Sequence, residues 1–172
     1  VNGNDGTVHG DPTWQPESGM LNGALLLDGV DDYVETAFVL DPSDGPFSVF
    51  AWIKGGAPGQ AVIAQTNSAN WLYADTHEGR LMTDIKSSGR SALPLSSQTV
   101  ITNDEWNYIG FVWDDSTRKL YVNNTMVAED QQNYITGSNN ALYIGAGKRL
   151  EPDTFFSGLI DDVRIYDRAI TP

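Results

Sequence analysis

Short apolar runs with a period of two, each closed by glycine, proline, asparagine, aspartate or serine, recur along the whole 172-residue chain. This alternation is typical of β-strands separated by turns, because successive side chains of a strand point to opposite faces of a sheet. No amphipathic pattern with a helical period extends beyond about two turns. The sequence therefore predicts antiparallel strands rather than alternating βαβ units, and two packed sheets would bury their apolar faces.

The alternation also sets the limits of the predicted strands. They are Ala24–Leu27, Tyr33–Thr36, Phe47–Ile53, Ala61–Gln65, Trp71–Ala74, Arg80–Ile85, Trp106–Trp113, Lys119–Val122, Thr125–Ala128, Ala141–Ile144 and Gly158–Tyr166. We expect an all-β fold, a two-sheet antiparallel β-sandwich.

Three stretches predict local detail. In "FSVFAWIKG" (47–55) both alternating sets of side chains carry apolar bulk, so this strand is predicted to be central and covered on both faces. In "GLIDDVRIYDR" (158–168), strict alternation places Asp161 on the same face as Val163 and Ile165, with the core. Asn123 and Asn124, between "KLYV" and "TMVA", predict a two-residue hairpin turn, because asparagine tolerates positive φ.

Length and charge restrict the domain number and the partners. The chain shows no linker, repeat or internal boundary, so residues 1–172 are expected to form one domain, which can bury roughly 70% of the unfolded surface. Ten basic against 23 acidic residues give a net charge of −13, which repels phosphate backbones and anionic membranes, so no nucleic-acid partner is expected. Without cysteine, and with His9 and His77 isolated, any bound metal should be hard and held by oxygen.

The sequence also bears on location. No apolar run approaches the ~20 residues that span a bilayer, and no basic start followed by an apolar stretch marks a signal peptide, so no membrane insertion is expected. The chain begins at Val1 rather than methionine. We expect it to be a processed or excised piece of a longer parent protein that carries other domains.

Several stretches together resemble one family, the LamG-like jelly rolls of the concanavalin A-like lectin and glucanase superfamily. The matching stretches are "GNDGTVHGDPTW", "GALLLDGVDDYVE", "FSVFAWIKG", "EWNYIGFVWDDSTRKLYVNNTMVA", "ALYIGAG" and "FSGLIDDVRIYDRAIT". Their order and spacing match over nearly the whole chain, and the pair "LDGVDDYV" and "GLIDDVRIYDRAIT" is the most specific part. Asn123 and Asn124 depart from the glycine after an acidic residue that many relatives have, which concerns a turn.

The resemblance implies a jelly-roll sandwich whose first and last strands are adjacent, usually with one structural calcium ion. It also implies a module of a secreted or cell-surface protein, often a polysaccharide-degrading enzyme, and many such modules bind glycans. The expected location is therefore extracellular or at the cell surface.

Acidic residues gather where the ends of such a fold would meet. If the first and last strands pair, as the resemblance implies, "NGNDG", the "LDGVDD" turn and the last strand converge, and their oxygens suit a calcium ion. The candidate calcium ligands are Asp28, Asp161, Asn4 and Asp162. The alternative is that Asp28, Asp31 and Asp32 only accept hydrogen bonds from turn amides. Asp32 is assigned to capping its own turn.

No catalytic constellation is found, and no enzyme is predicted. Retaining glycosidases need two carboxyl groups ~5 to 5.5 Å apart, and the Glu, Asp and Glu strand of the superfamily's glucanases has no counterpart here. Neither His9 nor His77 lies in a motif like that of polysaccharide lyases of similar fold. The constellations of residues that serine, cysteine and zinc chemistry require are also missing.

Recognition is the remaining function, and loops that mix aromatic with polar residues are where we expect it. Sugar sites combine an aromatic face with polar groups at the hydroxyls. The candidate ligand-binding residues are Trp71, Tyr73, Asp75, Lys86, Arg90, Lys148 and Arg149. Trp71 and Tyr73 alternate along a strand, so ordinary packing is the alternative for them. Core positions are predicted for Trp14, Trp52, Trp106 and Trp113.

The sequence thus predicts a non-catalytic carbohydrate-binding module of a secreted or cell-surface bacterial protein, appended to a polysaccharide-degrading enzyme and stabilised by structural Ca²⁺. The partner is a polysaccharide or oligosaccharide. Basic residues in two candidate loops of an acidic chain favour an acidic one, because arginine holds carboxylate or sulfate bidentately. The alternative is a protein-interaction or adhesion module of the same fold.

Overall fold

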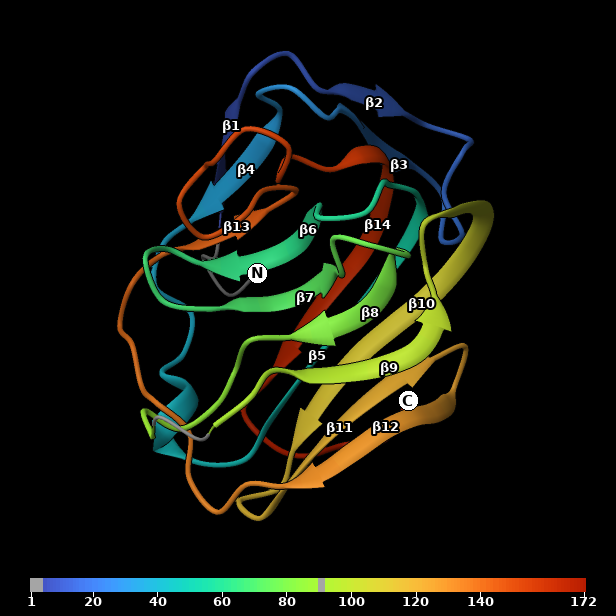
Figure 1. The fold of residues 1–172 in the computed structure, drawn as a ribbon. Coiled ribbons are helices and arrows are strands. Elements are labelled where there is room, and N and C mark those ends of the chain that lie inside the picture. The colour runs from blue at the N-terminus through green and yellow to red at the C-terminus, as the bar shows by residue number, and fades with distance from the viewer. Residues whose placement is uncertain (1–4, 90–91) are drawn as a thin grey trace.

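The computed structural model describes residues 5–89 and 92–172, and in it two antiparallel sheets pack face to face as a sandwich (Figure 1). Across sheet A the strands run in the order β1 (Gly6–His9), β4 (Tyr33–Thr36), β13 (Leu142–Ile144), β6 (Ala61–Gln65), β7 (Asn70–Ala74), β8 (Arg80–Thr83) and β9 (Leu95–Val100). Across sheet B they run in the order β12 (Thr125–Gln131), β11 (Thr117–Val122), β10 (Asn103–Trp113), β5 (Phe47–Gly55), β14 (Ser157–Tyr166), β3 (Ala24–Asp28) and β2 (Thr13–Gln15). A 3-10 turn, η1 (Pro42–Asp44), links β4 to β5.

The predicted β-sandwich is confirmed, and every predicted strand overlaps a strand of the structure. Three further strands, β1, β2 and β9, were not predicted from the sequence. All three lie at the edges of their sheets. An edge strand has one neighbour and needs less apolar surface, so "GTVH", "TWQ" and "LSSQTV" carry little of the alternation that marks a buried strand.

The main core lies between the two sheets, and β5 is covered on both faces, as predicted. Val49, Ala51 and Ile53 are fully buried against sheet A. On the outer face of sheet B, Phe50 is equally buried in a second cluster with Tyr121. Full burial of a side chain such as Val49, Ile53 or Phe50 contributes roughly 1.5 to 3 kcal/mol, so this strand stabilises both the main core and the outer face of sheet B.

Two hairpin turns are formed by residues with positive φ. Asn123 and Asn124, with φ of 51° and 65°, join β11 to β12, which confirms the predicted two-residue turn. Asp115, with φ of 71°, lies in the turn between β10 and β11. These angles are accessible to Asn and Asp without the strain that a branched residue would meet.

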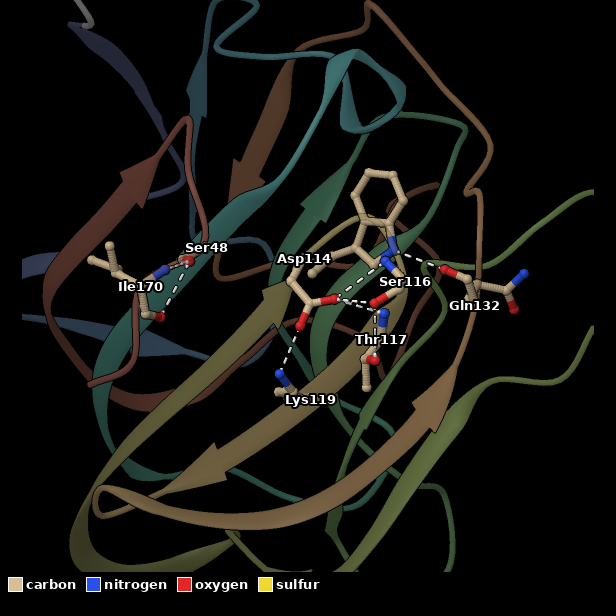
Figure 2. Close-up of polar contacts among 8 residues, drawn as sticks. Ser48, Asp114, Ser116, Thr117, Lys119, Gln132 and Ile170 are labelled. Carbon is tan, nitrogen blue, oxygen red and sulfur yellow. Dashed lines mark hydrogen bonds and ion pairs between the residues drawn. The ribbon is translucent and has the colours of Figure 1, made fainter.

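The Asp114 carboxylate closes the turn between β10 and β11 (Figure 2). It accepts hydrogen bonds from the main-chain N–H groups of Ser116 (3.2 Å) and Thr117 (2.8 Å), and from the Lys119 ammonium (2.7 Å). The hydrogen bond from Lys119 is the largest of the effects that lower the pKa of Asp114 to about 2; burial opposes the shift. The charged carboxylate therefore stabilises this turn.

Strand β14, near the C-terminus, pairs with two strands from the first third of the chain, β3 and β5. Ser157 to Ile160 pair with β3, and residues from Gly158 to Tyr166 pair with β5. The first and last strands of the predicted set, Ala24–Leu27 and Gly158–Tyr166, are therefore neighbours, although the shorter β1 and β2 precede them in the chain.

The predicted core positions of the tryptophans are confirmed only in part. Trp113 is 3% exposed, and its indole N–H donates to the carbonyl oxygen of Gln132 (3.0 Å). Trp52 and Trp106 are half-buried. Trp14 is 61% exposed, so its predicted core position is wrong: it belongs to the edge strand β2, where only one side of the strand is covered.

Within residues 5–89 and 92–172, no helix has the length and apolar character needed to cross a bilayer.

Candidate functional site

The acidic turn after β3 is held by its own carboxylates. Asp28 accepts hydrogen bonds from the main-chain N–H groups of Val30 (2.8 Å) and Asp31 (3.4 Å). Asp32, only 3% exposed, accepts from the main-chain N–H groups of Asp11 (2.7 Å) and Asp28 (3.0 Å). Asp32 therefore caps its own turn, as predicted, and backbone donors offset part of the repulsion among the three acids.

The same turn has the donor set of a hard cation. Asp28, Asp31 and Asp32 each place a carboxylate oxygen within 4.8 Å of the others. Together with Asp11 they line a shallow pocket of about 310 Å³. A carboxylate has about four lone-pair positions, so the carboxylates that accept the turn hydrogen bonds still have lone pairs available for a cation. The residues therefore fit a calcium ion in type and in spacing.

Two of the other predicted calcium ligands, Asp161 and Asp162, lie elsewhere. Ser157, not Asp161, is opposite Asp28 in the β3–β14 pairing. Asp161 lies four residues farther along β14, roughly 13 Å away at strand spacing, so Asp28 and Asp161 do not meet. Asp162 pairs with Arg164 instead, at 2.8 Å. Asn4 lies outside the described residues.

Asp161 does not face the core between the sheets, which corrects the prediction from strict alternation. The pairing of β14 with β5 is irregular between Asp161 and Arg164, and Asp162 has φ of 50°, so a bulge reverses the facing of the side chains. Asp161 is opposite Trp52, on the outer face. It is nevertheless 9% exposed, because the loop before β3 covers it and the Leu21 main-chain N–H donates to its carboxylate (2.8 Å).

Trp71 and Tyr73, the predicted aromatic platform, differ in their surroundings. Trp71 has no exposed surface and packs in the core, so no sugar ring can stack on it in this fold. Tyr73 is half-buried and donates from its hydroxyl to Asp84 (3.0 Å). Burial raises the pKa of the Tyr73 hydroxyl, and the neighbouring Asp84 carboxylate raises it further, so Tyr73 remains a neutral donor.

Asp84, which was not among the predicted residues, connects two of them. Its second oxygen accepts from the Lys148 ammonium (2.8 Å), so Tyr73 and Lys148 meet on one carboxylate. Arg149, the next residue, is exposed. Asp84 follows β8 directly, whereas the sequence placed it inside the predicted strand Arg80–Ile85, and a lone acid in that stretch was the signal.

Asp75 has a structural role in the turn between β7 and β8. Its carboxylate accepts from the main-chain N–H groups of His77 (2.7 Å), Glu78 (2.7 Å) and Arg80 (3.1 Å). Burial alone would raise the pKa of Asp75, but these backbone donors lower it below its usual value. The Asp75 carboxylate therefore stabilises its own turn, and these hydrogen bonds use both of its oxygens.

A groove of about 450 Å³ lies where the loop after β8 meets the turn between β6 and β7 and the loop before β13. We call it the loop groove. Its walls are mostly small or polar: Pro42, Gln65, Ser68, Ala69, Asp84, Ile85, Lys86, Ser87, Ser88, Gly89, Ala92 and Thr136. The predicted residue Lys86 lies in this wall beside Asp84. Arg90, predicted in the same loop, lies outside the described residues.

Hydrogen bonds between the loops fix the shape of the loop groove. The Thr136 main-chain N–H donates to the carbonyl oxygen of Lys86 (2.9 Å). The fully buried Gln65 side chain donates to the carbonyl oxygen of Ser138 (2.8 Å). Tyr134, two residues before Thr136, is 60% exposed. Its ring is the accessible aromatic surface on this loop, and it was not predicted from the sequence, because no ligand-binding residue was assigned to the segment between the predicted strands Thr125–Ala128 and Ala141–Ile144.

Arg118 supports the loop groove from beneath. This residue is 1% exposed, and its guanidinium donates to the main-chain carbonyl oxygens of Ile85 and Leu93 (3.1 Å) and to the carboxylate of Asp130 (2.9 Å). The two carbonyls lie at either end of the loop that forms one groove wall. An arginine on the same alternating set as Leu120 in β11 was the signal that a charge is buried here.

Comparison with known proteins gives one family. A family model described as "Concanavalin A-like lectin/glucanases superfamily" matches residues 28–172. No curated protein sequence gives a match.

Solved structures share the sandwich. The binding domain of Paraclostridial Mosquitocidal Protein 1 matches with a TM-score of 0.80 at 14% identity, over 99% of this chain and 45% of that one. Domain 4 of AbnA, a GH43 extracellular arabinanase from Geobacillus stearothermophilus in complex with arabinotriose, gives 0.62 at 21% identity, over 97% and 84%. A SAP-like pentraxin from Limulus polyphemus gives 0.56 at 18% identity, over 85% and 76%. At these identities the likeness shows the fold, and the chain spans less than half of the mosquitocidal binding domain.

Proposed function

The chain belongs to the concanavalin A-like lectin/glucanase superfamily, and from that premise we propose that it is a non-catalytic carbohydrate-binding module whose ligand occupies the loop groove. The observation that carries the proposal is the groove itself. Its volume of about 450 Å³ suits a small number of sugar rings, and three separate loops contribute polar groups to its walls.

The groups in the loop groove match what a sugar offers. The hydroxyls of Ser88 and Thr136 are positioned to exchange hydrogen bonds with sugar hydroxyls. Tyr134 does not line the groove, but it lies two residues before Thr136 in the same loop, and its exposed ring is the face that we propose for stacking at the edge of the site. Lys86, which has no carboxylate partner among the described residues, adds a positive charge. That charge favours a sugar with a carboxylate or sulfate group, so we propose an acidic oligosaccharide or polysaccharide as the ligand.

The single carboxylate in the described wall of the loop groove favours binding over hydrolysis as the proposed function. Of the described residues in the groove wall, Asp84 is the only carboxylate, and it is engaged by Tyr73 and Lys148. Glycosidases require two carboxyl groups about the scissile bond. The AbnA domain also supports the proposal, since a domain of this fold is there part of an arabinanase and was solved with arabinotriose.

We also propose that the acidic turn after β3 holds a structural calcium ion. Asp28, Asp31 and Asp32 would hold it, and the ion would neutralise the repulsion among them and fix the turn between β3 and β4. Asp161 is the second candidate, because a carboxylate that is 9% exposed and receives one backbone hydrogen bond retains acceptor capacity. The parent protein is proposed to be secreted or displayed at the cell surface, with this chain as one of its domains.

A glycan array tests the main proposal. The purified chain is applied to neutral and acidic glycans with calcium and again with a chelator, and binding is expected for an acidic set. If no glycan binds under either condition, the carbohydrate proposal is wrong, and protein interaction or adhesion becomes the function to test. Release of reducing ends that stops when Asp84 is replaced would instead show an enzyme.

A further inference from the structure

The two charged residues in the described wall of the loop groove cancel each other. Asp84 contributes a negative charge and Lys86 a positive charge, and the other described residues of the wall are neutral. The described wall therefore has no net charge of its own. Among the described residues, a preference of the groove for one sign of charge has to come from a group outside the wall that acts on one of these two.

The carboxylate of Asp84 has such groups behind it. The Lys148 ammonium donates to one of its oxygens (2.8 Å), and the Tyr73 hydroxyl donates to the other (3.0 Å). Neither Lys148 nor Tyr73 is among the residues that line the loop groove. The side chains of Asp84 and Lys148 are both partly buried, so water screens this ion pair less than a fully exposed one.

Main-chain hydrogen bonds hold Lys148 in this position. Its N–H donates to the side-chain oxygen of Asn70 (3.0 Å), and the carbonyl oxygen of Asn70 accepts from the N–H of Asp84 (2.8 Å). The carbonyl oxygen of Lys148 accepts from the N–H of Asn67 (2.8 Å), in the turn between β6 and β7. Asn70 thus fixes both partners of the ion pair, and the turn that forms part of the groove wall also holds Lys148.

We propose that Lys148 and Tyr73 neutralise the Asp84 carboxylate from behind, so that the loop groove presents the positive charge of Lys86 and selects anions. The inference rests on the proposed function in one respect, which is that the anion is the acidic group of a glycan. Without Lys148, the carboxylate in the wall would repel an acidic sugar, because juxtaposed like charges oppose binding. Lys148 and Tyr73 are then positioning residues that act through Asp84 and need touch no ligand.

Counting these charges gives the expected order of the variants. In the parent, Lys86 and Lys148 contribute two positive charges and Asp84 one negative charge, which leaves one net positive charge. Lys148→Gln leaves none, Asp84→Asn leaves two, and the double variant returns to one. A merely structural role of the ion pair predicts another order, because Asp84→Asn would then impair the groove rather than favour anions further.

The charge of the loop groove can be measured without a glycan, because the chain has no cysteine. Ser88→Cys places a single thiol at an exposed position of the wall. Its reaction rate is measured with dithiobis(nitrobenzoate), a dianion, and with dithiodipyridine, which is uncharged. The ratio of the two rates cancels changes in the ionisation of the thiol and reports the local potential. At low ionic strength this ratio should fall about threefold for Lys148→Gln, rise for Asp84→Asn and return to the parent value in the double variant.

Lys119→Gln is the matched control. Lys119 pairs with Asp114 (2.7 Å), its side chain is 26% exposed like that of Lys148, and it does not line the loop groove. This control and Lys148→Arg, which keeps the charge, should both retain the parent ratio, and all differences should vanish in roughly 1 M salt. A ratio that Lys148→Gln leaves unchanged, or that Asp84→Asn lowers, would overturn the proposal. If Lys148→Gln does not fold, the rise for Asp84→Asn decides.

The glycan array separates this inference from the proposed function, with Ser88 left intact in every variant. Lys148→Gln should weaken binding to acidic glycans about tenfold, and the double variant with Asp84→Asn should restore it. If the thiol reactions follow the expected order but no glycan binds the parent, the groove selects anions and the carbohydrate proposal is wrong. If acidic glycans bind in a way that requires Lys86 but not Lys148, the carbohydrate proposal stands and this inference is wrong.

Discussion

The buried guanidinium of Arg118 donates a hydrogen bond to the main-chain carbonyl oxygen of Ile85, which lies 33 positions earlier in the chain. The same guanidinium donates to the carbonyl of Leu93, so one side chain of β11 in sheet B holds both ends of the loop that connects β8 to β9 in sheet A. The shape of the loop groove depends on this connection. Any function placed in that groove is therefore sensitive to a residue that no ligand touches.

Arg118→Met should destabilise the protein and release the loop wall. The change leaves the buried carbonyl of Ile85 and the partly buried carbonyl of Leu93 without this donor and Asp130 without its partner, at a cost of about 3 kcal/mol in the free energy of unfolding. Urea denaturation measures that loss, and amide exchange should quicken from Lys86 to Leu93. Arg168→Met is the matched control, because Arg168 is 65% exposed and should change stability little. Equal effects of the two substitutions would contradict the role given to Arg118.

Asp114→Asn should lower stability in a pH-dependent way. The pKa of Asp114 in the fold is about 2, below its value in the unfolded chain, chiefly because Lys119 donates to it. A lowered carboxyl pKa stabilises the fold fully above the unfolded pKa near ~4, and this contribution disappears as the pH falls through the folded pKa. The variant should be less stable by about 1 kcal/mol near neutral pH, and the difference should shrink from about pH 4 to pH 2.

Denaturation at several pH values compares Asp114→Asn with the parent and with Asp115→Asn. Asp115 is exposed in the same turn, and asparagine tolerates its positive φ, so this control should behave like the parent. A deficit for Asp114→Asn that stays constant with pH would mean that its charge is not what stabilises the turn.

The strand pattern and the hairpin residues could be read from the sequence, whereas the register could not. Alternation found the strands because it records which faces are covered, and Asn123 and Asn124 marked a turn through their tolerance of positive φ. Asp161 was placed on the wrong face because one bulged residue reverses every later side chain, and nothing in "LIDDVR" signals the bulge.

The candidate site was found only in its outline. The loops around Lys86 and Lys148 do come together, but the residue that joins them, Asp84, and the support from Arg118 depend on contacts between distant strands. Alternation gives the face of a residue within its strand and not what covers that face. For that reason Trp71 was predicted to bind the ligand although it is fully buried, and Trp14 was predicted to lie in the core although it is exposed.

Removal of calcium should lower the thermal stability. A ligand that binds only the folded state stabilises it by about 2.7 kcal/mol at a hundredfold excess over Kd, so chelation should lower Tm and added calcium should restore it. Asp28→Asn should abolish this response if the acidic turn holds the ion, whereas Asp161→Asn should abolish it if the ion lies there. A parent Tm that does not respond to exhaustive chelation would refute the calcium proposal at both positions.

Replacing Lys86 and Tyr134 should weaken binding of an acidic glycan to the loop groove. Lys86→Gln removes a charged donor from the wall, and a lost hydrogen bond to a charged group costs about 1.5 to 3 kcal/mol, or roughly tenfold to a hundredfold in Kd. Tyr134→Ala removes the exposed ring of the neighbouring loop, with a loss of about 1 to 3 kcal/mol when such a ring stacks on the ligand. Calorimetry with the glycan selected from the array measures both.

The controls for these two substitutions separate a local contact from a general change of charge. Lys54→Gln alters the net charge by the same amount on β5, away from the loop groove, and should leave Kd unchanged. Binding by the parent should weaken with added salt, because an exposed ion pair is screened over about 8 to 10 Å at ordinary ionic strength, and Lys86→Gln should lose most of that salt dependence. If Lys86→Gln and Tyr134→Ala fold and bind like the parent, the ligand lies outside the loop groove. If Lys54→Gln weakens binding as much as Lys86→Gln does, the affinity depends on the net charge of the protein and not on a contact with Lys86.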